Sequence, residues 1–111
     1  MIQPIRIVQS DYGYQIPFTL EDGNGNAVDL TNSTVVLTVQ DSQDPNQTAL
    51  FTGNLTIDSA PAGTCHYVVA SGNFPNPGTF LAQITAAYAT EVLTWSGVTI
   101  IVDPKLPKSI N

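Results

Sequence analysis

Apolar and polar residues alternate strictly over residues 14–21, and no other feature of this chain limits its possible folds as much. The two sets of side chains are Tyr14, Ile16, Phe18 and Leu20, and Gln15, Pro17, Thr19 and Glu21. Because successive side chains of a strand point to opposite faces, this pattern is typical of a β-strand with one face on a core. A Gly/Asn-rich turn over residues 22–26, a short return over Ala27–Leu30 and a second alternating segment over Val35–Val39 follow. The stretch therefore predicts an all-β protein.

The rest of the chain repeats this arrangement of short strands and turns, and no part of it has a helical pattern. Further strands are expected at Ile5–Gln9, Leu50–Phe51, Leu55–Ile57, Cys65–Val69, Phe80–Ala87 and Glu91–Val102. Short strands separated by turn residues are typical of a sandwich or barrel. About seven or eight strands in roughly 100 residues favour a single antiparallel immunoglobulin-like β-sandwich. The Cys…Trp…Cys spacing of antibody domains is absent.

The last expected strand contains a slip in its alternation. Leu93 and Trp95 are odd-numbered, whereas the apolar residues of the 98–102 segment are even-numbered. One extra residue near positions 96–97 would return both halves to a common face, which is the arithmetic of a β-bulge. A tight turn that splits the segment in two is the alternative. We favour the bulge because it leaves a long partner for the Phe80–Ala87 strand.

The length of 111 residues corresponds to one domain. We expect the sandwich to occupy residues 1–102 and the segment 103–111, DPKLPKSIN, to be an extended tail, because it contains two prolines. With Cys65 as its single cysteine, the chain cannot form an internal disulfide, which favours folding in a reducing compartment. It has no apolar run of signal-peptide length and no 18-residue apolar stretch, so we expect a soluble chain made in the cytoplasm.

Charge excludes two classes of partner. Charged residues make up 11% of the chain and its net charge is −6, with Arg6, Lys105 and Lys108 as the three basic residues. Proteins that bind nucleic acids or anionic membranes need clustered basic residues, so we expect neither partner. The polar surface must come from Thr, Ser, Asn and Gln, a composition that suits strands and packed assemblies.

Cys65 and His66 are the residues most often associated with catalysis or metal binding, but their positions do not favour either role. Adjacent residues of a strand point to opposite faces, so we expect Cys65 in the core and His66 at the surface. A zinc site needs about three or four such ligands, and His66 is the single histidine of the chain. No G-x-S-x-G motif is present. We therefore expect no catalytic residue, no metal site, no cofactor and no enzyme activity.

The segment 22–26, DGNGN, resembles the first half of a calcium-binding loop. Ala27 stands where such a loop has its turn glycine, and Ser33 stands where it has its bidentate acid. We therefore expect a hairpin turn. Weak calcium binding through Asp22 and Asp29 is the alternative.

Aromatic residues are the remaining candidates for a binding surface. The set comprises Tyr12, Tyr14, Tyr67, Tyr88 and Trp95. Aromatic side chains at alternating strand positions are more often core residues or cross-strand pairs than ligand platforms. Tyr12 and Tyr88 fall in predicted turns, so these two are the candidates for exposure. Exposed aromatic residues in loops would support stacking on a glycan.

Several of these motifs resemble one known family. They are Asp11-Tyr12-Gly13-Tyr14, Phe18-Thr19-Leu20, the segment Asp22–Thr31, Leu55-Thr56-Ile57, Gly63 before the Tyr67 strand, the segment Gly78–Ile84 and the closing Val98–Val102 strand. Together they look like the N-terminal domain of phage baseplate upper proteins, an immunoglobulin-like domain. The resemblance implies a non-enzymatic virion part that attaches one component to another and is made in the host cytoplasm.

In that family the domain is followed by a stalk and a receptor-binding module, whereas here nine residues follow the last expected strand. We therefore do not expect a receptor-binding role. A small baseplate, tail or neck component, or a protein that decorates the capsid, fits the resemblance better.

The function we expect is that of a structural subunit of a tailed-phage virion, which docks on other virion proteins and on copies of itself. Exposed sheet edges offer unpaired backbone groups for strand addition. In the tail, Leu106 and Ile110 are candidate apolar anchors, and Lys105 and Lys108 are candidates to meet the acidic surface of another copy. The alternative is a glycan-binding or adhesion module on a virion or cell surface.

Overall fold

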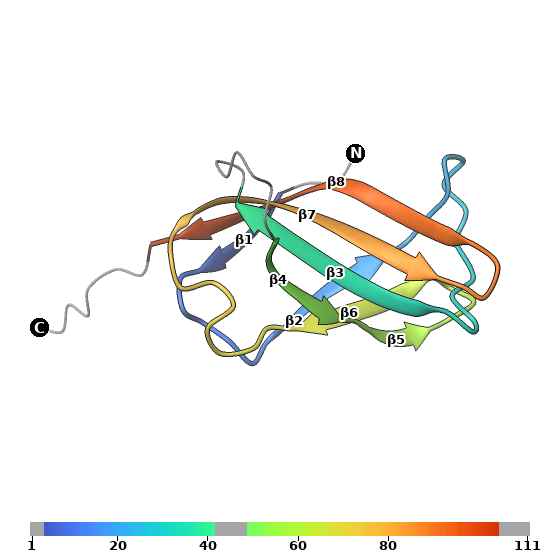
Figure 1. Cartoon of the computed structure of the whole chain (residues 1–111), viewed down its shortest axis with the longest axis horizontal. Coiled ribbons are helices and arrows are strands. Elements are labelled where there is room, and N and C mark those ends of the chain that lie inside the picture. Colours follow the sequence, from blue (N-terminus) through green and yellow to red (C-terminus); the bar gives the residue numbers. More distant parts are fainter. Residues whose placement is uncertain (1–3, 42–48, 105–111) are drawn as a thin grey trace, which may run out of the picture.

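The chain folds into two β-sheets packed face to face, as the computed structural model shows (Figure 1). The structure describes residues 4–41 and 49–104. The strands of these residues are β1 (Ile5–Val8), β2 (Gln15–Thr19), β3 (Thr34–Asp41), β4 (Ala49–Asn54), β5 (Thr56–Ser59), β6 (Thr64–Val68), β7 (Gly78–Ala87) and β8 (Val92–Asp103). None of the described residues forms a helix long and apolar enough to cross a membrane. The all-β prediction is confirmed.

The two sheets have the strand order of an immunoglobulin-like sandwich. The larger sheet has the order β1-β8-β7-β3-β4 and the smaller sheet has the order β2-β6-β5. Thus β2, β5 and β6 take the places of strands B, D and E, and β3, β7 and β8 take those of C, F and G. One pair differs from the expected antiparallel arrangement, because β1 runs parallel to β8 with Ile5 opposite Ile100. Side chains alternate in the same way in parallel and antiparallel strands, so residue periodicity does not reveal this difference.

The core lies between the sheets and is built from the inward residues of the strands. Ile16 and Leu20 of the alternating segment are buried, while Gln15 and Pro17 are exposed, as predicted. The largest fully buried side chains include Phe74, Leu30, Leu37, Ile84 and Ile100. Among the described residues, no polar or charged residue is buried. Burial of apolar side chains is therefore what holds the two sheets together.

Phe74 is a core residue that lies in a predicted loop, between β6 and β7. Its side chain is 1% exposed, and its ring meets Phe51 and Phe80 edge-on at centroid distances of 5.1 and 6.0 Å. Asn73 beside it accepts a hydrogen bond from the Tyr67 hydroxyl at 2.6 Å, which ties the connection to the core. Alternation does not identify such a residue, because the connection has no regular period.

The slip in the last strand is a β-bulge, as predicted, and β8 is one continuous strand. Its pairing with β7 steps from Ala82–Val98 to Ile84–Trp95, which leaves one extra residue on β8. Gly97 lies at this step with a φ of 85°, a left-handed conformation that glycine adopts without a steric penalty.

The chain crosses from the larger to the smaller sheet at Leu55, between β4 and β5. Its backbone N–H donates a hydrogen bond to the Val35 carbonyl at 2.9 Å at the crossing point. The two strand pieces expected around Gly53 therefore belong to different sheets. Gly53 itself faces the core, and the Tyr67 ring lies so close that an added Cβ would overlap it.

Replacing Gly53 with alanine is expected to destabilise the fold by about 1–3 kcal/mol, because the new methyl group would push the Tyr67 ring out of its position. Urea denaturation measures the free energy of unfolding. Gly23→Ala is the matched control, since no atom lies within 4 Å of its Cβ position. Equal stability of the two variants would contradict the close packing of Gly53 on Tyr67.

Candidate docking surface

Apart from Asp103 at its margin, uncharged outward residues of β3, β7 and β8 form a surface, which we call the outer face. They are Thr34, Val36, Thr38 and Gln40 on β3, Thr79, Leu81, Gln83 and Thr85 on β7, and Thr94, Ser96, Thr99 and Ile101 on β8. At the margin of this face, Arg6 of β1 and Asp103 of β8 form an ion pair at 2.8 Å. Hydroxyl, amide and aliphatic groups therefore make up the interior of the outer face.

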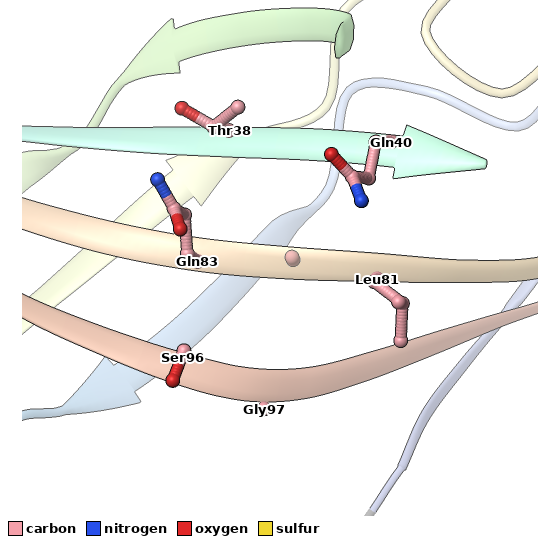
Figure 2. Close-up of a pocket in the computed structure, with 7 residues that line it drawn as sticks. Thr38, Gln40, Leu81, Gln83, Ser96 and Gly97 are labelled. Atoms are coloured by element: carbon pink, nitrogen blue, oxygen red, sulfur yellow. The ribbon is translucent and has the colours of Figure 1, made fainter. Parts of the chain in front are cut away.

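A shallow hollow of about 290 Å³ lies in the outer face. Its lining residues are Thr38, Gln40, Leu81, Ala82, Gln83, Ser96 and Gly97. Figure 2 shows that the side chains of Gln40 and Gln83 lie over the space between β3 and β7. Gly97 lies on β8, on the other side of β7. Gly97 has no side chain, so the bulge leaves open space beside Leu81 and Ser96.

The chemistry of this hollow suits recognition. Its amides and hydroxyls can donate and accept hydrogen bonds, and Leu81 adds apolar area. None of its lining residues is a histidine, carboxylate or lysine that could act as a general base for Ser96. Hydrogen bonding and apolar contact are therefore the interactions that this hollow offers.

The two candidate tyrosines lie in different connections of the fold and differ in environment. Tyr12 is 63% exposed in the connection between β1 and β2. Tyr88 follows β7 and is half-buried, and its hydroxyl donates a hydrogen bond to the Asp29 carbonyl at 2.7 Å. Trp95 is also half-buried, and its indole N–H donates to the Glu21 carbonyl at 2.8 Å. The structure thus does not gather these aromatic side chains into one platform. The tail candidates Lys105, Leu106, Lys108 and Ile110 lie outside the described residues.

Cys65 and His66 point to opposite faces of β6, as predicted. Cys65 is buried, and burial together with the negative charge of Asp58 raises the pKa of its thiol to about 11. His66 lies on the other face, where its Nδ1 atom is 2.9 Å from the Asp58 carboxylate. A thiol with this pKa stays protonated at neutral pH, so Cys65 has the properties of a core residue.

Asp22 and Asp29, the two acids of the calcium-binding alternative, accept hydrogen bonds within their own turns. Asp22 accepts backbone hydrogen bonds from Asn26 and Asn24, which lower the pKa of its carboxyl group. Asp29 accepts hydrogen bonds from the hydroxyl and the backbone N–H of Thr31, which lower its pKa in the same way. Both turns lose this support as the pH falls through the lowered pKa values. Within residues 4–41 and 49–104, no three His, Cys, Asp or Glu side chains gather as metal ligands would.

Comparison with known protein families gave a match that covers nearly the whole chain. The model of the BppU N-terminal domain, the N-terminal domain of the baseplate upper protein, matches residues 1–110. The chain belongs to this family. A search of curated proteins found no match. The match to the family model confirms the family resemblance that the turn and strand motifs indicate. The BppU N-terminal domain is a structural domain of the phage baseplate.

The Cys65 thiol of this BppU N-terminal domain is expected to react with a disulfide reagent at pH 8 at least about a hundredfold more slowly in the folded chain than in urea. A rise in pKa from 9.0 to about 11 lowers the thiolate fraction by about that factor, and burial blocks access as well. The same shift means that its contribution to stability is complete below pH 9 and is lost as the pH rises toward 11. Equal rates in the folded and unfolded chains would contradict the buried position.

Proposed function

We propose that this chain is a structural subunit of a tailed-phage virion that acts by docking on other virion proteins and on copies of itself. Its place is in the baseplate, tail or neck, or on the capsid surface, and it performs no chemistry. The observation that carries the proposal is the uncharged outer face on a domain of the phage baseplate family.

The outer face suits docking because its interior has no charged side chain. Removing a charged side chain from water without a well-placed partner costs several kcal/mol, so charges are depleted in the centre of protein interfaces. The Arg6–Asp103 pair lies at the margin, and the hollow beside Gly97 offers amides and hydroxyls for hydrogen bonds. A partner surface can therefore cover this face without leaving an unpaired charge.

The sheet edges and the tail supply the other proposed contacts. Among the described strands, β4 and β1 are the edges of the larger sheet and β2 and β5 are the edges of the smaller one. Open edges accept an added strand from a neighbour. Leu106 and Ile110 are proposed as apolar anchors on an adjacent subunit, and Lys105 and Lys108 as partners for its acidic surface, because each copy carries a net charge of −6. Tyr12 is a further proposed contact, since its side chain is exposed.

No specific observation favours the glycan-binding alternative. A stacking platform needs several exposed aromatic rings side by side. Tyr88 and Trp95 use their polar atoms in hydrogen bonds to the backbone and pack against the core. Tyr12 belongs to a different connection of the fold.

Placing a lysine in the outer face is expected to lower the number of copies per particle about tenfold or more. Leu81→Lys would bury an unpaired charge at the interface, which costs about 2–5 kcal/mol. Val68→Lys is the matched control, because Val68 is 46% exposed and Leu81 is 41% exposed but Val68 belongs to the smaller sheet. Quantitative mass spectrometry of purified particles measures incorporation, and thermal melting confirms that both variants fold. Normal incorporation of Leu81→Lys would refute docking through the outer face.

Deletion of residues 105–111 tests the tail. If these residues hold an adjacent subunit, the shortened chain will be incorporated less than the full chain when both are expressed together. The ratio of the two chains in purified particles gives the result. A ratio equal to that in the cell would remove the tail from the proposal.

A further inference from the structure

The sandwich is open along one side, between β2 and β8. β2 is an edge strand of the smaller sheet, with β6 on its other side. β8 pairs with β1 only from Ile100 to Asp103, so among the described residues the Val92–Thr99 part of β8 has no strand on the side away from β7. In the described part of the chain, two edges that pair with no further strand therefore border the same opening between the sheets.

This opening contains two adjoining hollows, which we call the seam groove. The first, of about 390 Å³, is lined by Ile5, Pro17, Phe18, Thr19, Leu20, Glu21, Asp22, Ile84, Trp95 and Val98. The second, of about 410 Å³, is lined by Glu21, Asp22, Gly23, Val28, Leu93, Thr94 and Trp95. Glu21, Asp22 and Trp95 belong to both hollows, so two largely apolar spaces flank one acidic position.

The two acids of the seam groove have no cation nearby in the described part of the chain. The ion pairs there are Arg6–Asp103 and His66–Asp58, and neither involves Glu21 or Asp22. Asp22 uses one carboxylate oxygen for the backbone of its own turn. The groove therefore consists of two hollows with apolar lining residues, and the acidic residues Glu21 and Asp22 lie where these hollows adjoin.

We propose that the seam groove of one copy binds residues 105–111 of a second copy in an extended conformation, an inference that rests on the proposed function above. In an extended segment, Leu106, Lys108 and Ile110 project to the same side because side chains alternate. This order of apolar, basic and apolar side chains matches the order of sites in the groove. Leu106 and Ile110 lie about 13 Å apart, at about 3.3 Å per residue, and occupy one hollow each. Lys108 then lies over Glu21.

The backbone of the segment is compatible with this position. With Leu106, Lys108 and Ile110 directed inward, their N–H and C=O groups face one open edge, and Pro107 faces the other way. Proline is tolerated on an edge strand when its missing N–H is directed away from the pairing side. The segment can therefore add to the free part of β8 while its side chains fill the groove.

Residues 105–111 are too short to reach the far hollow of their own chain, so the segment must come from a second copy. Leu93, which lines the far hollow, is ten residues from Asp103 along β8, or about 33 Å at about 3.3 Å per residue. Ile110 follows Asp103 by seven residues and reaches at most about 25 Å from it. In addition, β1 occupies the edge of β8 that the segment of the same chain would have to pass. The contact is therefore head-to-tail, a type that generates rings or filaments.

A charge exchange between groove and tail tests the proposal on the full chain. Sedimentation velocity measures self-association, and the emission of Trp95, the single tryptophan, reports on the groove itself. We expect the wild-type chain to self-associate as its concentration rises, with a shift of Trp95 emission to shorter wavelength. Glu21→Lys and Lys108→Glu are each expected to weaken association about tenfold or more. An equimolar mixture of these two variants is expected to restore it, because each tail then meets a groove of opposite charge.

Glu91→Lys is the matched control, since Glu91 is an exposed acid that lines neither hollow and its substitution changes the net charge equally. A wild-type chain that stays monomeric at every concentration would overturn the proposal. So would a mixture no better associated than either variant, or a Glu91→Lys chain weakened as much as Glu21→Lys.

Particle incorporation separates this proposal from the function on which it rests. If Glu21→Lys enters particles normally while Leu81→Lys does not, the seam groove is refuted and the docking function stands. If Leu81→Lys also enters particles normally, docking through the outer face fails, whatever the chains do in solution.

Discussion

The packing of apolar side chains between two sheets is the interaction on which the rest of this molecule depends. Leu37 and Ile84 of the larger sheet and Ile16 of the smaller sheet meet in a core without a buried polar or charged residue among the described residues. Packing this close leaves no room for a side chain at Gly53, and it draws Phe74 in from a connection between strands. Because the inward positions are committed to the core, the outward positions are free to serve function.

The main property of the outer face is that its interior carries no charged side chain. With 11% charged residues, the chain places an ion pair at the margin of the outer face and leaves the interior of that face to threonine, glutamine and aliphatic groups. Such a surface can be covered by a partner at little cost in desolvated charge. Two acids, Glu21 and Asp22, lie on the seam between the sheets. The charged and uncharged parts of the surface thus lie on different sides of the sandwich, and the docking proposals concern both of them.

The sequence predicted the strands well and the individual surfaces less well. The alternation of residues 14–21, the bulge near Gly97 and the opposite orientations of Cys65 and His66 all followed from the two-residue period of a strand, which is a local property. Phe74 was missed because it lies in an aperiodic connection. The outer-face hollow was missed as well, since its lining comes from strands distant in the sequence. The excess of threonine and glutamine was the one signal that could have indicated it.

By itself, the sequence determined the all-β class, the number and position of most strands, and which side chains of each strand face inward. These follow from side-chain alternation and turn residues, which act over a few neighbours. The tertiary structure alone decided that β1 joins β8 in parallel, that the chain changes sheets at Leu55, and that an open seam remains between β2 and β8. Those features depend on which edges meet in space. Because backbone hydrogen bonds between strands have the same chemistry everywhere, the pairing is selected by how the whole core packs.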